Sequence, residues 1–105
     1  MATAIQTTSR NGRVDVRDVV YVSWRAEPAF ILNLSEGGMA VQAMEILSPG
    51  AALALSFPLP ENGAELQGVA RVVWSDLSGR AGLQFINLSE FDRYQLRQWL
   101  GRNLN

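Results

Sequence analysis

One short segment of the chain holds small polar residues suited to bind a ligand. Residues 33–38 read Asn-Leu-Ser-Glu-Gly-Gly, and Asn33, Ser35 and Gly38 in it follow the pattern N-x-S-x-x-G. The segment lies between two apolar runs, so it is predicted to be a loop at a strand junction. An amide and a hydroxyl provide short hydrogen-bonding groups, and a glycine lets the backbone approach a ligand because it has no Cβ. The segment therefore predicts a small polar ligand surface.

A second candidate segment lies upstream and contributes positive charge. It contains Arg10, Arg13 and Arg17. A guanidinium group is planar and always charged, and it binds phosphate or guanine through two parallel hydrogen bonds. Arginines on an N-terminal segment, followed by a small polar loop, predict a site for an anionic purine ligand. We interpret the chain as a nucleotide-binding module and not as an enzyme.

The composition narrows the functional classes. The chain has 105 residues, enough for one domain with a modest core. Its net charge is −1, and all nine basic residues are arginines. It has no cysteine and no histidine, which excludes disulfides, thiolate metal ligands and the commonest general base. Since no convergent pair of carboxylates is visible either, we expect no metal site and no catalytic centre.

Apolar and polar residues alternate along most of the chain, which is typical of half-buried strands. Within this alternation, Trp24 and Trp74 share the parity of the apolar residues, and we expect both indoles, with that of Trp99, in the core. Prolines and glycines separate the alternating stretches at turns. The pattern predicts six strands, over residues 14–25, 29–34, 38–44, 52–57, 66–74 and 81–86.

The spacing of the apolar residues changes near the C-terminal end. Ser89 is a good N-cap residue, and Leu96, Trp99 and Leu100 follow it at helical spacing. This predicts one helix over residues 90–101.

Six strands followed by one helix predict an all-β fold with one helix. We expect a small six-stranded antiparallel β-barrel that is closed by a C-terminal α-helix. Residues 1–12 have no periodic pattern and are predicted to be a flexible N-terminal arm. Residues 13–105 are predicted to form the barrel domain.

With these segments in this order, the chain resembles the PilZ domain family, the bacterial receptor module for cyclic di-GMP. The resemblance covers nearly the whole chain. It rests on the N-terminal arginines, the segment 33–38, Leu-Ser-Pro-Gly at 47–50, Val-Val-Trp at 72–74, Gly-Leu-Gln-Phe at 82–85 and the closing helix. It implies a six-stranded antiparallel barrel with a C-terminal helix, which agrees with the fold predicted from the periodicity.

The resemblance also implies which residues bind the ligand. The family's pattern is R-x-x-x-R on the arm and [D/N]-x-S-x-x-G on the barrel. Asn33, Ser35 and Gly38 match the second half, and the resemblance places the first two against a guanine of the ligand. Asparagine offers that guanine a neutral carbonyl, a weaker acceptor than the aspartate that the pattern also allows.

The arm matches the first half of the pattern less closely. Arg13 and Arg17 have the R-x-x-x-R spacing, but Arg17 falls inside the first predicted strand. The family's second arginine comes just before that strand, a position that Arg13 fits best. The residue four positions earlier is then Ser9, with Arg10 beside it. The arm is therefore degenerate, shifted by one residue, or built on Arg13 and Arg17.

The resemblance implies a cytoplasmic cyclic di-GMP receptor that signals when its arginine arm orders around the ligand. A protein partner is expected downstream, with no cofactor beyond the ligand. The alternative is a degenerate PilZ-like domain that does not bind cyclic di-GMP and acts through protein–protein contacts. The pI of about 5.3 disfavours a third interpretation, a single-stranded nucleic-acid binder. We expect no membrane association, because no apolar run approaches the roughly twenty residues that span a bilayer.

Overall fold

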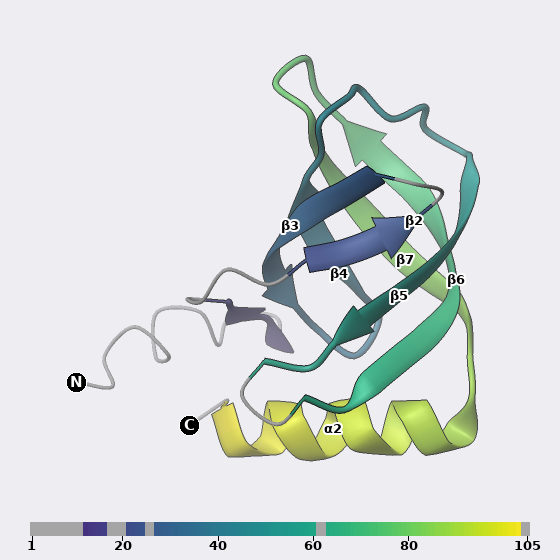
Figure 1. The fold of residues 1–105 in the computed structure, drawn as a ribbon. Coiled ribbons are helices and arrows are strands. Elements are labelled where there is room, and N and C mark those ends of the chain that lie inside the picture. The colour runs from purple at the N-terminus through teal and green to yellow at the C-terminus, as the bar shows by residue number, and fades with distance from the viewer. Residues whose placement is uncertain (1–11, 17–20, 25–26, 61–62, 104–105) are drawn as a thin grey trace.

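The computed structural model describes residues 12–16, 21–24, 27–60 and 63–103, with backbone alone at 21–24 and 27. Seven strands and a C-terminal helix make up this part of the chain (Figure 1). In chain order these elements are β1 (Val14–Asp15), β2 (Tyr21–Trp24), β3 (Glu27–Leu34), β4 (Gly38–Gln42), β5 (Ala52–Pro58), β6 (Glu65–Ser75), β7 (Arg80–Leu88) and α2 (Glu90–Asn103).

Six of the strands form a closed ring. The order β3–β2–β5–β6–β7–β4 returns to β3, because β3 pairs with β2 on one edge and with β4 on the other. Neighbouring strands in the ring are antiparallel, and the ladder between β2 and β5 is limited to one pair, Ser23 and Ser56. The short strand β1 extends the edge of β3 that β2 also occupies. The predicted fold, a six-stranded antiparallel barrel with a C-terminal helix, is confirmed.

The first predicted strand, residues 14–25, is wrong as a single element. Asp15 pairs with Asn33 and Tyr21 pairs with Phe30, both on the same edge of β3. Asp15 and Tyr21 are six positions apart in the sequence, but their partners Asn33 and Phe30 are only three positions apart. The ladder therefore shifts register between β1 and β2, which a period of two in the sequence does not reveal. Residues 17–20, and Arg17 with them, lie outside the described residues.

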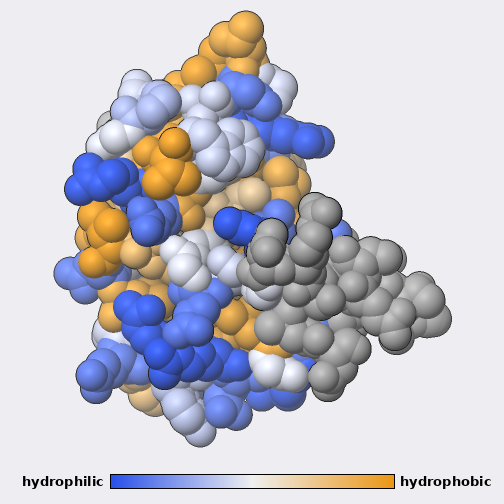
Figure 2. Space-filling view, turned by 180° about the vertical axis from the view of Figure 1, so that it is seen from behind, coloured by the Kyte–Doolittle hydropathy of each residue, from blue (hydrophilic) through white to orange (hydrophobic). Residues whose placement is uncertain are grey.

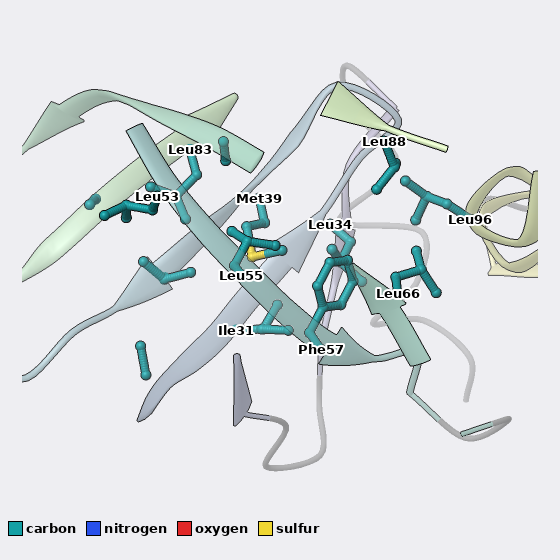
Figure 3. Packing of buried hydrophobic residues seen from close by; sticks show 14 of the residues in the cluster. Ile31, Leu34, Met39, Leu53, Leu55, Phe57, Leu66, Leu83, Leu88 and Leu96 are labelled. Atoms are coloured by element: carbon teal, nitrogen blue, oxygen red, sulfur yellow. The ribbon is translucent and has the colours of Figure 1, made fainter. Parts of the chain in front are cut away.

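The core fills the barrel and continues to the helix. Phe57 is fully buried, and its ring stacks on that of Phe85 with centroids 6.0 Å apart. Leu88, at the end of β7, lies beside Leu96 of α2, so the helix closes one open end of the barrel (Figures 1 and 3). The polar side of α2 faces outward, at the bottom of Figure 2. The apolar spacing thus correctly identified the buried side of the helix.

Hydrogen bonds hold α2 near both of its ends. The predicted N-cap is confirmed, since the Ser89 hydroxyl accepts a hydrogen bond from the Asp92 amide at 3.0 Å. The indole of Trp99 is buried and donates to the Pro60 carbonyl at 2.9 Å. A buried indole N–H that lacked such an acceptor would cost stability. The expectation that Trp99 lies in the core is confirmed.

The expectation that Trp74 lies in the core is wrong, because its side chain is 47% exposed. Val72 pairs with Leu83 and Trp74 pairs with Gly82, so Val73 is an extra residue in β6. This β-bulge reverses the side-chain alternation after Val72 and turns Trp74 outward. The indole then covers Gly82, where a Cβ would collide with its Nε1. The side chain of Trp24 lies outside the described residues.

Leu96→Ala should destabilise the fold by about 2–5 kcal/mol, because it removes a fully buried side chain between helix and barrel. Tyr94→Ala on the same helix is the matched control, since that side chain is 57% exposed and its loss should cost little. Urea unfolding followed by far-UV circular dichroism measures both. Equal midpoints for the two variants would contradict the assignment of α2 as part of the core.

Candidate functional site

The segment 33–38 forms the end of β3, a short loop and the start of β4. Within the loop, the amide and the hydroxyl of Ser35 both donate to the Gly38 carbonyl, at 2.9 and 3.3 Å. The Phe85 amide on β7 donates to the Gly37 carbonyl at 2.8 Å. Ser35 is buried, so its hydroxyl first of all closes the loop. Because these bonds also tie the loop to β7, its backbone is held in place before any ligand binds.

Gly38 has a structural role that the sequence analysis did not foresee. It pairs with Gln84 of β7, and a Cβ built on it would collide with the Leu83 carbonyl oxygen. A glycine is therefore required here by the close approach of β4 and β7. Gly37 differs, since a Cβ there would meet nothing within 4 Å. The contact of Gly38 with a ligand stays a prediction.

Asn33 is turned toward the outer surface by a β-bulge. Ile31 pairs with Val41 and Asn33 pairs with Ala40, so Leu32 is the extra residue. Both Ile31 and Leu34 are buried, although they are three positions apart, while Asn33 is half-buried. The sequence does not mark this bulge, because Leu32 is also apolar and lies two residues before Leu34. Bulges often redirect side chains at binding sites, and this one presents the amide of the motif.

The structure brings together two of the predicted site residues. The Nη1 group of Arg13 donates to the Oδ1 atom of Asn33 at 2.9 Å. Arg13 directly precedes β1, where Asp15 pairs with Asn33, so the ladder itself carries the arginine to the motif. Arg10 and Arg17 lie outside the described residues, and their contacts stay predictions.

Two hollows lie beside the motif. The loop–helix cleft, of about 440 Å³, is lined by Gly12, by the loop residues Ser35, Glu36 and Gly37, and by Arg97, Leu100 and Gly101 of α2. The strand hollow, of about 580 Å³, is lined by Asp15, Val16, Leu32, Asn33 and Arg80. Asn33 and Ser35 therefore face different hollows, although the sequence pattern treats them as one unit.

An ion pair joins the motif loop to the helix across the loop–helix cleft. The Nε group of Arg97 lies 2.7 Å from a carboxylate oxygen of Glu36, and both side chains are about half exposed. Exposed ion pairs contribute little stability, so the charge of Arg97 is available to an anion in the cleft. Arg97 was not among the site residues predicted from the sequence, because 61 residues separate it from Glu36.

The turn between β6 and β7 positions Arg80. The Asp76 carboxylate accepts hydrogen bonds from the Ser78 hydroxyl at 2.6 Å, from the Ser78 amide at 2.9 Å and from the Arg80 amide at 3.2 Å. The hydrogen bond from the Ser78 hydroxyl is the largest cause that lowers the pKa of Asp76 below its usual 3.8, and desolvation opposes it. The two amides and the charge of Arg80 lower this pKa further. Sequence analysis did not identify Arg80 as a site residue.

Metal sites and membrane-spanning helices were sought in the part of the chain that the structure describes. No group of three or more Asp or Glu residues there could hold a metal ion. No helix there is long and apolar enough to cross a membrane.

The comparison with protein families decides the identity. The chain matches the PilZ domain family over residues 8–102. It belongs to the PilZ family. PilZ domains are ligand-binding effector modules, and the family is one of cyclic di-GMP receptors. The match begins at residue 8, so it includes Arg10, Arg13 and Arg17.

Solved structures support the PilZ fold. The Bacillus subtilis inhibitor of motility, MotI/DgrA, aligns with a TM-score of 0.68 and 25% identity over 86% of this chain. The present chain spans about half of that protein, 48% of its length. An uncharacterised Legionella protein aligns with a TM-score of 0.60 and 18% identity, covering 86% of this chain and 90% of its own. A comparison with curated proteins finds no significant match.

Gly38→Ala should destabilise this PilZ domain by about 1–3 kcal/mol or more, because the new Cβ forces β4 and β7 apart. Gly37→Ala is the matched control next to it and should change the free energy of unfolding little, since its Cβ enters open space. Chemical denaturation measures both values. A Gly38→Ala variant as stable as the wild type would contradict the close approach of the two strands.

The Asp76 carboxyl should titrate below pH 3.8, because its charged form accepts three hydrogen bonds. A pKa that is lower in the folded state contributes stability above the unfolded value, and this is lost as the pH falls through the folded value. NMR titration of the side-chain carboxyl carbon measures the midpoint. Ser78→Ala should raise that midpoint toward the usual value. An unchanged midpoint in this variant would show that the hydroxyl is not the main cause.

Proposed function

We propose that this PilZ domain binds cyclic di-GMP on the outer face of its barrel, beside residues 33–38. The observation that carries the proposal is the 2.9 Å hydrogen bond between Arg13 and Asn33. It joins a residue of the arginine segment to the first residue of the [D/N]-x-S-x-x-G motif. The two halves of the family's binding pattern therefore meet at one place on the surface.

The charges around the motif suit this ligand. Cyclic di-GMP carries two phosphates and two guanines, so it needs cations near hydrogen-bonding groups. Arg13 uses one N–H group on Asn33, and Arg97 lines the adjacent loop–helix cleft. A guanidinium group can pair with a phosphate by two parallel bonds. In this proposal the phosphates lie between these arginines, over the closed loop that Ser35 holds.

The signal arises when the arginine arm closes over the ligand. This part of the proposal is supported by sequence alone, since residues 1–11 lie outside the described part of the chain. We further propose that the domain acts in the cytoplasm, where an intracellular second messenger would reach it, and that the closed arm presents a new surface to a protein partner. Ordering a segment on binding costs free energy, so the arm's composition sets the affinity.

One observation favours the second candidate function, that of a domain acting through protein contacts without the nucleotide. Met44 and Ile46, between β4 and β5, and Leu77, between β6 and β7, are exposed by 77, 55 and 88%. Both connections lie at the end of the barrel opposite α2 (Figure 1). Hydrophobic side chains also form the tip of the molecule at the top of Figure 2. Exposed apolar side chains gathered at one end are typical of a contact surface. Absence of cyclic di-GMP binding would favour this function.

Arg13→Ala should weaken cyclic di-GMP binding about ten- to hundred-fold, because it removes a charge-assisted contact and the partner of Asn33. Arg10→Ala should cost less and Arg17→Ala least, whereas Ser9→Arg should tighten binding by restoring the R-x-x-x-R spacing. Isothermal titration calorimetry at near-physiological salt measures the affinities. Arg102→Ala is the charge-matched control, because it lies in the last turn of α2 and lines neither hollow.

Two results would contradict this assignment. If Arg17→Ala abolishes binding while Arg13→Ala leaves it intact, the second arginine of the arm is Arg17, and the arm is read here four residues too early. If the wild type shows neither heat nor amide chemical-shift changes at high concentrations of cyclic di-GMP, the domain is degenerate and the second function holds.

A further inference from the structure

Two residues of opposite charge line the strand hollow. Asp15 of β1 and Arg80 of β7 both line it, and both side chains are exposed. Within the described part of the chain, neither the Asp15 carboxylate nor the Arg80 guanidinium makes a side-chain hydrogen bond or an ion pair. The two groups therefore face one hollow without neutralising each other, with the amide of Asn33 between the elements that carry them.

The strands hold these residues at fixed positions around the hollow. Asp15 is the direct ladder partner of Asn33, so the two side chains stand next to each other on the outer face. Arg80 begins β7, which is separated from β3 by β4 alone. The backbone of Arg80 is fixed by its bond to the Asp76 carboxylate. The hollow is thus bordered by an anionic acceptor on one side and a cationic donor on the other.

This arrangement matches the edges of guanine. Guanine offers two donors, N1–H and N2–H₂, on one edge and two acceptors, O6 and N7, on the adjacent edge. A carboxylate accepts from the first pair, and a guanidinium donates to the second in the bidentate manner that makes arginine the commonest partner of guanine. We infer that the strand hollow is a guanine subsite, in which Asp15 accepts from N1–H and N2–H₂ and Arg80 donates to O6 and N7.

The inference also accounts for the residue at position 33. An asparagine there gives the base only a neutral acceptor, and its Oδ1 atom is already bonded to Arg13. Asp15, across the ladder, supplies the charged acceptor that Asn33 lacks. Adenine has no N1–H donor and no O6 acceptor, so the same pair of charges disfavours it. The subsite therefore determines base specificity, while the arginines beside the motif hold phosphate.

The test compares Asp15→Asn with the wild type by calorimetry, using cyclic di-GMP and cyclic di-AMP. This inference rests on the proposed function. If Asp15 binds the guanine, the Asp15→Asn variant should bind cyclic di-GMP about ten-fold more weakly than the wild type. Its preference for cyclic di-GMP over cyclic di-AMP should also be smaller. An ordinary surface charge predicts the opposite, because removing a negative charge beside a dianionic ligand tightens binding of both nucleotides. Glu65→Gln, an exposed residue that lines neither hollow, is the charge-matched control.

Arg80→Ala provides the second measurement. It should weaken cyclic di-GMP binding about ten-fold or more, leave cyclic di-AMP binding less affected, and leave the thermal midpoint near that of the wild type. Arg102→Ala controls for loss of one positive charge. If both substitutions leave the affinity and base preference unchanged while Arg13→Ala abolishes binding, the guanine subsite is refuted and the proposed function stands. If the wild type binds no cyclic di-GMP, both are refuted.

Discussion

The pairing of β3 on both of its edges is the constraint on which the rest of this structure depends. One edge carries β1 and β2 and the other carries β4, so β3 both closes the barrel and connects the arginine segment to the motif. A closed sheet leaves no long edge open to other chains. The same pairing places Arg13 and Asp15 at Asn33, which no contact within either segment could do. The same strand therefore closes the barrel and brings the residues of the candidate site together.

The motif loop couples this strand to the helix. Ser35 and Gly38 close the loop, Gly37 accepts a bond from β7, and Glu36 reaches Arg97 on α2. These four neighbouring residues thus close the loop and link it to both β7 and α2. An anion that draws Arg97 away from Glu36 would loosen an exposed ion pair, which costs little. Backbone hydrogen bonds hold the loop in place, whereas only an exposed ion pair joins its Glu36 side chain to Arg97. A ligand could replace this ion pair without disrupting the barrel.

Periodicity predicted the barrel and the helix because burial imposes a period of two on strands and about 3.6 on helices. It failed at the bulges. The extra residue Val73 turned Trp74 outward, and the register shift between β1 and β2 divided one predicted strand into two. Local alternation contains no information on which partner residue is skipped. The bulge at Leu32 was missed as well, because Leu32 is apolar and lies two residues before Leu34, as in a regular strand.

The residues of the candidate site also fall into those that a local sequence pattern predicts and those that only the three-dimensional fold brings together. Asn33, Ser35 and Gly38 could be found from sequence because they are adjacent and form a pattern, and Arg13 could be found by resemblance. Arg80 and Arg97 could not, because strand order and helix docking bring them to the motif from 47 and 61 residues away, measured from Asn33 and from Glu36. The sequence pattern did not reveal the structural roles of two of its residues, whose contacts with a ligand stay predictions. Ser35 and Gly38 first of all serve the loop and the approach of β4 to β7.

A chain with a net charge of −1 has no general attraction for a dianion, so the local arrangement of charge must supply it. Arg80 and Arg97 each line one of the two hollows, as do the carboxylates Asp15 and Glu36. Arg13 is bonded to Asn33, which lines the strand hollow. In water such charges interact weakly beyond about 10 Å, the screening length at 0.1 M salt. Only a ligand that enters the hollows meets these charges at close range. In the guanine subsite that we propose, a phosphate would gain from the arginines alone, whereas a guanine would gain from both signs of charge. Such a site would favour a guanine nucleotide over a simple anion.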